Sequence, residues 1–386
     1  MRIRLNYKLS YGSFSLYTVA FIMYFISLFM DDLALSFGPV GKLMRYLSYG
    51  MFFVVSLARC KTARVQLLTA ACIVFSMGLA VFTRDIYYCA FVIILAASYK
   101  QNPKSVFQVS FYLLCVLTIT TVLLSIVGVF PNLNTANQNY GSRLSLGFYH
   151  SNVLPMVVCY LIGYRFMIKG NSIKYSELLF WGLLSLGVYH ICKGRNGLIG
   201  SILLIVGFVF YKNKNKFKVL YYASMFSTFL VSVILLILSF LQGKHLRIMY
   251  IINKFFTGRL ALAYHQINST GLHFINLMNK NSFTSFDTFV LDSGYLYLAI
   301  HYGLFFTLIY SLLQIIIAKK YKYNAIALLV FLVNTITNAI DNDLFSYNML
   351  PFFVLLAANL DVNTAVRALL NKLRLTEKKG FRITDR

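Results

Sequence analysis

The chain has 386 residues, of which 59% are hydrophobic and only 12% are charged. Soluble proteins carry about 25% charged residues, so this composition excludes an ordinary soluble domain and indicates an integral membrane protein. The net charge of +25 does not indicate a nucleic-acid partner. The basic residues stand at the ends of apolar segments, and no aromatic-basic RNA-binding module is present.

Twelve apolar segments are candidates for membrane-spanning helices, which need about 20 mostly apolar residues each. If the N-terminus lies inside, every inner connector is basic, and the inner side holds 25 of the 36 lysines and arginines. This bias is typical of the charge pattern that orients membrane proteins. We therefore predict an all-α fold, a polytopic transmembrane helical bundle with both termini in the cytoplasm. The predicted spans are 13–30, 44–58, 65–83, 86–99, 105–130, 150–168, 177–192, 196–211, 219–241, 292–317, 323–340 and 344–360.

One transmembrane domain is predicted over residues 1–361, followed by a basic cytoplasmic tail over 362–386. The tail is amphipathic, so we expect it to lie on the headgroups of membrane lipids. The one long polar interruption, at about 242–291, is predicted to be a large extracytoplasmic loop that contains short helices. The six cysteines show no CxxC spacing and sit mostly in apolar runs, which favours packing over metal binding or disulfides.

The first outer loop with chemical character precedes the span at 150–168. It is rich in Asn, Gly and Ser and contains Arg143 with no acid nearby. A guanidinium placed against the positive-inside bias suits a phosphate partner, although it could also snorkel to lipid headgroups. His150 and Asn152 follow at the start of the next span. His150 is a candidate for acid-base work or simply an interfacial residue at a helix end.

A second outer turn, Lys193-Gly194-Arg195-Asn196-Gly197, opens the span at 196–211. Backbone N–H groups at a helix start, together with Arg195, would make an anion site. The alternative is a basic turn with a glycine cap. The spacing does not match a Walker P-loop.

The long loop contains Lys254 and then Thr257-Gly258-Arg259, which precede an amphipathic stretch from Leu260. We expect a helix at the membrane interface there, with Arg259 at its N-terminal end. His265 lies nearly two turns further on, so the two side chains need not share a face.

Asp292 begins the tenth predicted span, with Tyr295 on the same face and His301 deeper in the bundle. An ionisable group inside a span suggests function. Asp341, in the last outer turn, is expected to cap the following helix, and a divalent metal site is the alternative. All six histidines fall at or near the outer side in this topology, which favours chemistry on that side.

Several short patches and the overall layout resemble the Wzy-type polysaccharide (O-antigen) polymerases, within the O-antigen polymerase and ligase group. Each patch is short, and their order and shared outer side carry the resemblance. The patches are Arg143 with Gly147-Phe148-Tyr149-His150-Ser151-Asn152, Gly194-Arg195-Asn196-Gly197, Thr257-Gly258-Arg259-Leu260, and Asp292-Ser293-Gly294-Tyr295 followed by Gly303.

The resemblance implies a glycosyltransferase-type enzyme in the bacterial cytoplasmic membrane. It would join oligosaccharide repeat units carried on undecaprenyl pyrophosphate, at the outer face, in capsule, exopolysaccharide or O-antigen synthesis. Such enzymes are thought to use no metal or other cofactor, and a chain-length regulator and a flippase are possible partners. Arg143, Arg195 and Arg259 would hold the departing pyrophosphate. The base would be His150, His265 or Asp292, and substrate-binding residues would include Asn152, Lys254 and Tyr295.

Three alternatives remain open from the sequence. A ligase-like transferase of the same group would attach a finished glycan to a different acceptor. A polysaccharide flippase or other transporter would bury charges at mid-membrane around broken helices. A structural membrane subunit would leave the outer arginines and histidines unexplained.

Overall fold

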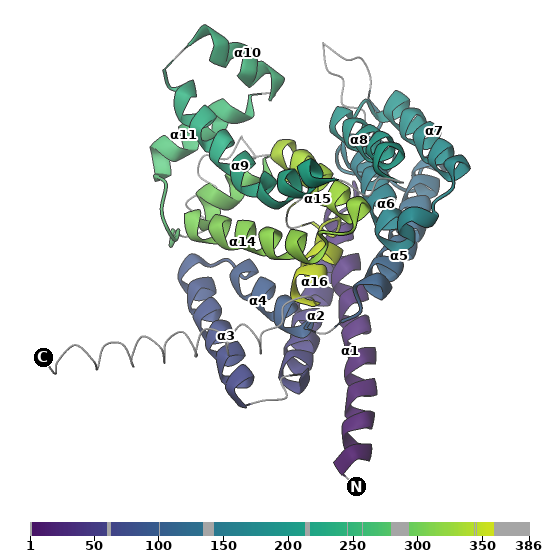
Figure 1. Cartoon of the computed structure of the whole chain (residues 1–386), viewed down its shortest axis with the longest axis vertical. Helices are drawn as coiled ribbons and strands as arrows, with labels where there is room; N and C mark the ends of the chain where they lie inside the picture. Colours follow the sequence, from purple (N-terminus) through teal and green to yellow (C-terminus); the bar gives the residue numbers. More distant parts are fainter. Residues whose placement is uncertain are drawn as a thin grey trace, which may run out of the picture.

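The protein is all-helical wherever the computed structural model describes it (Figure 1). One isolated antiparallel bridge joins Leu33 and Phe148. Asp292 and the predicted tail over 362–386 lie outside the described residues. The described residues are 2–59, 63–99, 101–133, 143–212, 217–244, 246–256, 258–278, 293–342, 344 and 346–358.

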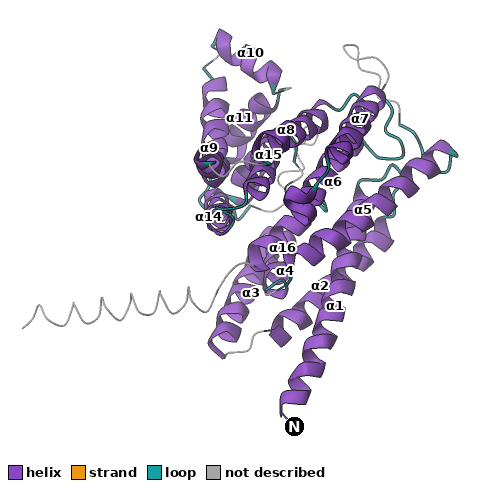
Figure 2. Cartoon of the chain, turned by 45° about the vertical axis from the view of Figure 1, so that its right-hand side comes forward, coloured by secondary structure: helices purple, strands orange, loops and turns teal. Residues whose placement is uncertain are grey.

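The N-terminal part is built on two long helices, α1 (Arg2–Asp31) and α2 (Gly38–Arg59), which pack along each other (Figure 2). α3 (Ala63–Thr83) and α4 (Tyr87–Ala97) follow, and α4 packs against both α2 and α3. With 11 residues, α4 is shorter than the predicted segment 86–99. At about 1.5 Å per residue, it is too short to cross a bilayer alone.

The next helices form a second group around α6 (Val153–Lys169), which contacts its four neighbours in this group. The first helix of the group begins at Pro103 and is capped by the Asn102 side chain. Both residue types favour the start of a helix at these positions. A short 3-10 turn separates α6 from the helix that follows it. The neighbours are α5 (Pro103–Ile126), η1 (Gly170–Ser172), α7 (Tyr175–Cys192) and α8 (Arg195–Tyr211).

The described part of the predicted loop 242–291 contains two short helices. α9 (Lys218–Gln242) leads into α10 (Arg247–Phe255) and α11 (Arg259–Thr270), and α11 packs back against α9. α11 begins at Arg259, as the amphipathic pattern predicts, and ends at Gly271, whose φ of 79° is a left-handed value that favours glycine.

The predicted continuous span over 292–317 is wrong, because the helix is broken. α13 (Gly294–Tyr297) runs into a π-helical turn, η2 (Leu298–Tyr302), and α14 (Leu304–Lys320) starts after Gly303, whose φ is 103°. The last described part of the long loop, residues 271–278, lies against the break, and we call it the returning limb. There the Phe305 backbone N–H donates to the Phe274 carbonyl at 2.8 Å.

The centre of the bundle is formed by α6 and α15 (Ala325–Ile340), which are buried on nearly all sides. α15 contacts α6, α8 and α9 (Figure 1). The last described helix, α16 (Leu350–Ala358), packs against α4 and α5 and begins later than the predicted 344.

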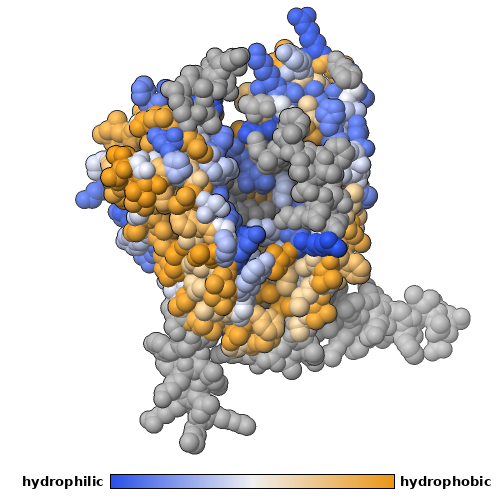
Figure 3. All heavy atoms as spheres, turned by 180° about the vertical axis from the view of Figure 1, so that it is seen from behind, coloured by the Kyte–Doolittle hydropathy of each residue, from blue (hydrophilic) through white to orange (hydrophobic). Residues whose placement is uncertain are grey.

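The outer helices present apolar faces that suit a lipid environment. On α5 the exposed residues Tyr112, Val116, Ile119 and Leu123 recur every third or fourth position. In the described part of the chain, three helices are long and apolar enough to cross a membrane, namely α5, the α6–η1 segment and α9. Figure 3 shows one face of the molecule, with hydrophilic residues gathered in a hollow between hydrophobic flanks.

Candidate functional site

Two helix starts meet at one end of the bundle because glycines let them touch. An ideal Cβ on Gly197 would lie 2.3 Å from the Pro155 carbonyl carbon, and one on Gly194 would lie 2.6 Å from Pro155 Cγ. No larger residue fits at either position without displacing α6. The turn that carries Arg195 is therefore packed on the first turn of α6, directly beside Asn152.

A buried polar cluster joins this turn to the long loop. Arg259 Nη2 donates to Asp341 Oδ1 at 3.1 Å, and Asn196 Nδ2 donates to Asp341 Oδ2 at 2.6 Å. The side chains of Arg259 and Asp341 are only 10% and 15% exposed. We call Asn196, Arg259 and Asp341 the Asp341 cluster. Its members come from α8, α11 and the end of α15, so it ties together three segments far apart in the sequence.

The fourth sequence patch reaches the same place. An ideal Cβ on Gly294 would lie 3.5 Å from the backbone oxygen of Asp341 and 3.1 Å from Leu344 Cβ. Asp292 is outside the described residues, but Ser293, which follows it, is 1% exposed at this contact. The patches at Gly194–Gly197, Arg259 and Ser293–Gly294 thus converge on Asp341.

Buried polar atoms without partners gather around the cluster. Within the described residues, the Ser151 hydroxyl, the Ser293 hydroxyl and the Asn196 carbonyl oxygen are buried and accept or donate no hydrogen bond. Such atoms are uncommon in folded proteins and call for an explanation, of which a polar ligand is one.

The loop that carries Arg143 lies against the end of α7. The Leu144 backbone N–H donates to the Ile191 carbonyl at 3.4 Å, which places Arg143 near the end of α7. Arg143 is partly buried. His150 Nδ1 accepts a hydrogen bond from the Asn152 backbone N–H at 3.1 Å, so the imidazole stabilises the backbone just before α6.

Among the predicted site residues that the structure describes, only Arg259 belongs to the Asp341 cluster, and three others lie well apart from it. Lys254 and His265 are exposed on α10 and α11. Tyr295 is 2% exposed and lines a cavity inside the bundle together with Tyr310 and Asn334.

Asp341 itself was missed as a site residue by the sequence reasoning. It ends α15 and pairs with Arg259, whereas the helix it was expected to cap begins only at Leu350. The local sequence around an acid in a turn is the same whether the acid caps a helix or forms an ion pair. The basic partner on a distant loop is what distinguishes them.

A second buried acid was also missed. Asp85 is 1% exposed and lies in the turn before α4. Its Oδ2 lies 3.2 Å from His301 Nε2 and accepts from the Tyr302 hydroxyl at 3.2 Å. The ring of Tyr297 stacks on His301 at 4.8 Å. We call Asp85, His301 and Tyr302 the Asp85 cluster, and it sits at the π-helical break.

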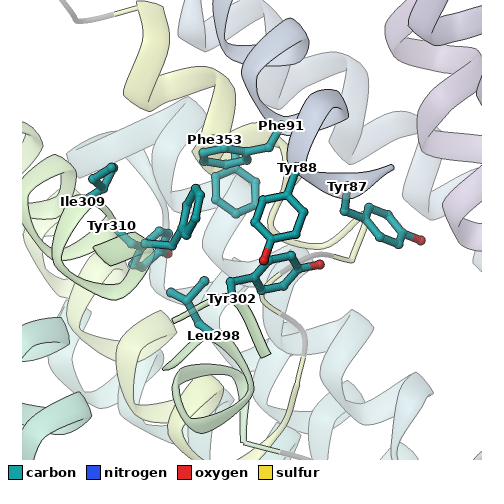
Figure 4. A pocket seen from close by; sticks show the side chains of 9 residues that line it. Tyr87, Tyr88, Phe91, Leu298, Tyr302, Ile309, Tyr310 and Phe353 are labelled. Atoms are coloured by element: carbon teal, nitrogen blue, oxygen red, sulfur yellow. The ribbon is translucent and has the colours of Figure 1, made fainter. Parts of the chain in front are cut away.

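An aromatic cavity of about 40 Å³ adjoins the Asp85 cluster. Figure 4 shows Tyr88 and Phe91 from α4 and Phe353 from α16 gathered opposite Leu298 and Tyr302. The rings of Tyr88 and Tyr302 meet edge to face, with centroids 4.9 Å apart. The lining is suited to a hydrocarbon or to the apolar face of a ring.

Together, the Asp341 cluster and the Arg195 turn offer guanidinium groups, an amide, a carboxylate and buried hydroxyls at one end of a helical bundle. This set can bind an anion and a hydroxyl-rich ligand side by side. No protein-family model matches the sequence, and no curated protein or solved structure matches it.

Proposed function

We propose that the protein polymerises oligosaccharide repeat units carried on a polyprenyl pyrophosphate, at the outer face of the bacterial cytoplasmic membrane. The observation that carries the proposal is the convergence on Asp341. Three of the outer patches that resemble the Wzy-type polymerases meet there. Arg259, from the loop predicted to be outside, is buried at that meeting point.

The chemistry of the site fits transfer of a glycan from a lipid pyrophosphate. The bond that breaks joins the anomeric carbon to the pyrophosphate, so negative charge develops on the leaving group. Guanidinium forks stabilise such charge through paired hydrogen bonds. Arg259 and Arg195 are suited to this role because both stand at helix starts, where backbone donors also favour anions.

The aromatic cavity supports a lipid-linked substrate. It lies between α4, α14 and α16, within the apolar body of the bundle. Its aromatic lining could contact a small part of a hydrocarbon chain without any loss of hydrogen bonds.

A flippase is the second candidate function, favoured by one observation. The break at Gly303 and the buried Asp85 cluster are features that transporters place around their substrates. The two functions differ in where lipid-linked single units accumulate when the protein fails. A polymerase defect leaves them on the outer face, and a flippase defect leaves them on the inner face.

The test is an arginine series in cells that make the glycan. We expect Arg259→Ala to lower polymer formation by about 100-fold, the typical effect of removing one preorganised charge stabiliser. Arg259→Lys should restore little, because an ammonium lacks the planar fork. Arg195→Ala and Arg143→Ala extend the series. Arg247→Ala is the matched control, since it removes an exposed arginine from the same loop.

The readouts are the length ladder of surface glycan, the amount of protein in the membrane and the side on which lipid-linked units accumulate. Loss of the ladder with units outside supports the polymerase. Units inside would instead support the flippase. A normal ladder in all three site variants, with normal protein levels, would rule out the proposed site.

A further inference from the structure

Two adjacent acids at the end of α1 lie in different surroundings. Asp31 forms an ion pair with Arg45, which also donates to the Tyr87 hydroxyl at 3.1 Å, and the Asp31 side chain is 55% exposed. Asp32 forms no ion pair with any described residue. Neighbouring carboxyl groups with such different environments are a common sign of divided chemical roles.

Asp32 is held in place by the segment that leads into α6. Its backbone oxygen accepts from the Tyr149 N–H at 2.9 Å, and the next residue, Leu33, bridges to Phe148. Gly147, with φ 90°, presses this segment against α5, because an ideal Cβ there would lie 2.9 Å from Thr121 Cγ2. Asp32 is therefore fixed beside the loop that carries His150.

Three aromatic side chains pack against one another next to Asp32. The ring of Phe29 lies 5.8 Å from that of Phe148 and 5.1 Å from that of Tyr347, and all three side chains are at most 2% exposed. Partial burial of the carboxyl group raises the pKa of Asp32 from its ordinary value to about 7. The nearby Tyr347 hydroxyl lowers this pKa, and the nearby charge of Asp31 raises it.

The segment between α15 and α16 runs from the Asp341 cluster to the surroundings of Asp32. It starts at Asp341, which binds Arg259, and continues to Tyr347, which faces Asp32. Ser346, next to Tyr347, lines an apolar cavity with Tyr24 and Leu28 of α1. Asp32 is also close to the Arg195 turn, because Tyr149, which donates to its backbone oxygen, stands three residues before Asn152, and Asn152 Cα lies 3.4 Å from an ideal Cβ on Gly194.

We propose that Asp32 is the proton acceptor of the transfer reaction. This inference rests on the proposed function. The acceptor sugar's hydroxyl oxygen attacks the anomeric carbon of the growing chain while its proton passes to the Asp32 carboxylate. The bond between the anomeric carbon and the oxygen of the lipid pyrophosphate breaks, and the electron pair of that bond stays on the pyrophosphate. Arg259 and Arg195 bind the pyrophosphate as it leaves. Asp32 then returns the proton to solvent, which restores the carboxylate.

The experiment uses full-length protein in liposomes and lipid-linked repeat units extracted from a host strain that lacks this protein. Rates are measured between about pH 5 and about pH 9, because a base must be deprotonated to act. We expect the wild-type rate to rise with pH and to level off above a midpoint near 7. Asp32→Asn should lose about 100-fold or more, the typical contribution of general base catalysis.

Three further variants make the test specific. Asp32→Glu keeps a carboxylate and should restore part of the rate. Tyr347→Phe removes the hydroxyl that lowers the pKa of Asp32, so the midpoint should move to higher pH. Asp31→Asn makes the same change one residue away and removes a charge that raises the pKa of Asp32, so the midpoint should move to lower pH, with at most a few-fold loss of rate above it.

A readout without substrate accompanies the rates. Infrared spectra of the same liposomes should show a protonated carboxyl band that disappears as pH rises through 7 and is absent in Asp32→Asn. If Asp32→Asn keeps both the rate and the midpoint of the wild type, the inference is overturned. If folded wild-type protein polymerises nothing at any pH, the proposed function fails instead. The band would then still report the pKa of Asp32.

Discussion

Gly197 shows how the absence of one side chain sets the geometry of the site. Its α carbon stands against the backbone of Pro155, so the starts of α6 and α8 touch. Any Cβ there must push two helices apart, because backbone atoms cannot rotate away as side chains can. This contact brings the Arg195 turn beside Asn152.

We predict that Gly197→Ala destabilises the protein by about 1–3 kcal/mol or more, the usual cost of overpacking a well-packed region. Thermal unfolding of detergent-solubilised protein measures the change. Gly187→Ala is the control, since Gly187 is also helical and no atom lies within 4 Å of its ideal Cβ. That variant should be neutral or slightly stabilising. Equal stability of the two variants would contradict the close packing of α6 and α8.

At the same scale, basic candidates are easier to single out from the sequence than acidic ones. Arg195 and Arg259 stand out because they lie in short patches on the predicted outer side. Asp32 and Asp341 do not stand out, because an acid at a helix end is usually a cap. Their roles depend on partners such as Tyr347 and Arg259, which lie far along the chain. Asp292 stays a prediction.

Among the elements, the broken helix at Gly303 is the feature that the sequence does not reveal. The apolar run through this region contains no proline and predicts a continuous helix. The break depends on the returning limb of the loop, where Asn276 is 1% exposed. Asn276 Nδ2 donates to the Ile300 carbonyl at 2.8 Å, and its backbone oxygen accepts from the Tyr88 hydroxyl at 3.0 Å. Helix period alone cannot report such a long-range contact.

We predict that Gly303→Ala releases the returning limb of the loop. An ideal Cβ on Gly303 would lie 2.7 Å from the Phe274 carbonyl oxygen, in addition to the strain of a positive φ. Limited proteolysis should therefore cut the variant faster between α11 and α13 than the wild type.

Gly128→Ala separates backbone strain from the loss of the contact. Gly128 has a φ of 80°, but no atom lies within 4 Å of its ideal Cβ. Both variants carry the strain of a positive φ at an alanine, of about 1–3 kcal/mol. Only Gly303→Ala should change the cleavage pattern of the loop, and the same pattern in both variants would assign the effect to strain.

Taken as a whole, the molecule has a helix at every apolar segment that the sequence predicts, with one of them broken. The helical class follows from composition because the backbone of an apolar chain must satisfy its own hydrogen bonds. The twelve-span topology remains a prediction. Helix length and apolar composition together support three crossings among the described residues.

Epitope insertion tests the orientation of the whole bundle. An epitope after Lys244, at the end of α9, should be accessible to antibody in intact spheroplasts, because the loop is predicted to be outside. An epitope after Lys322, between α14 and α15, should be accessible only after permeabilisation. The reverse pattern would invert the topology and remove the proposed site from the outer face.

The ion pair between Arg259 and Asp341 also has a consequence for turnover. The site carries its own internal anion, so under the proposed function an incoming pyrophosphate would have to compete with a tethered carboxylate for the same guanidinium. Such competition weakens the binding of substrate and product alike, and it shortens the time for which a spent carrier stays bound. Asp341→Asn would then hold the product longer, and an enzyme that must release one carrier per added unit would be slowed by its own affinity.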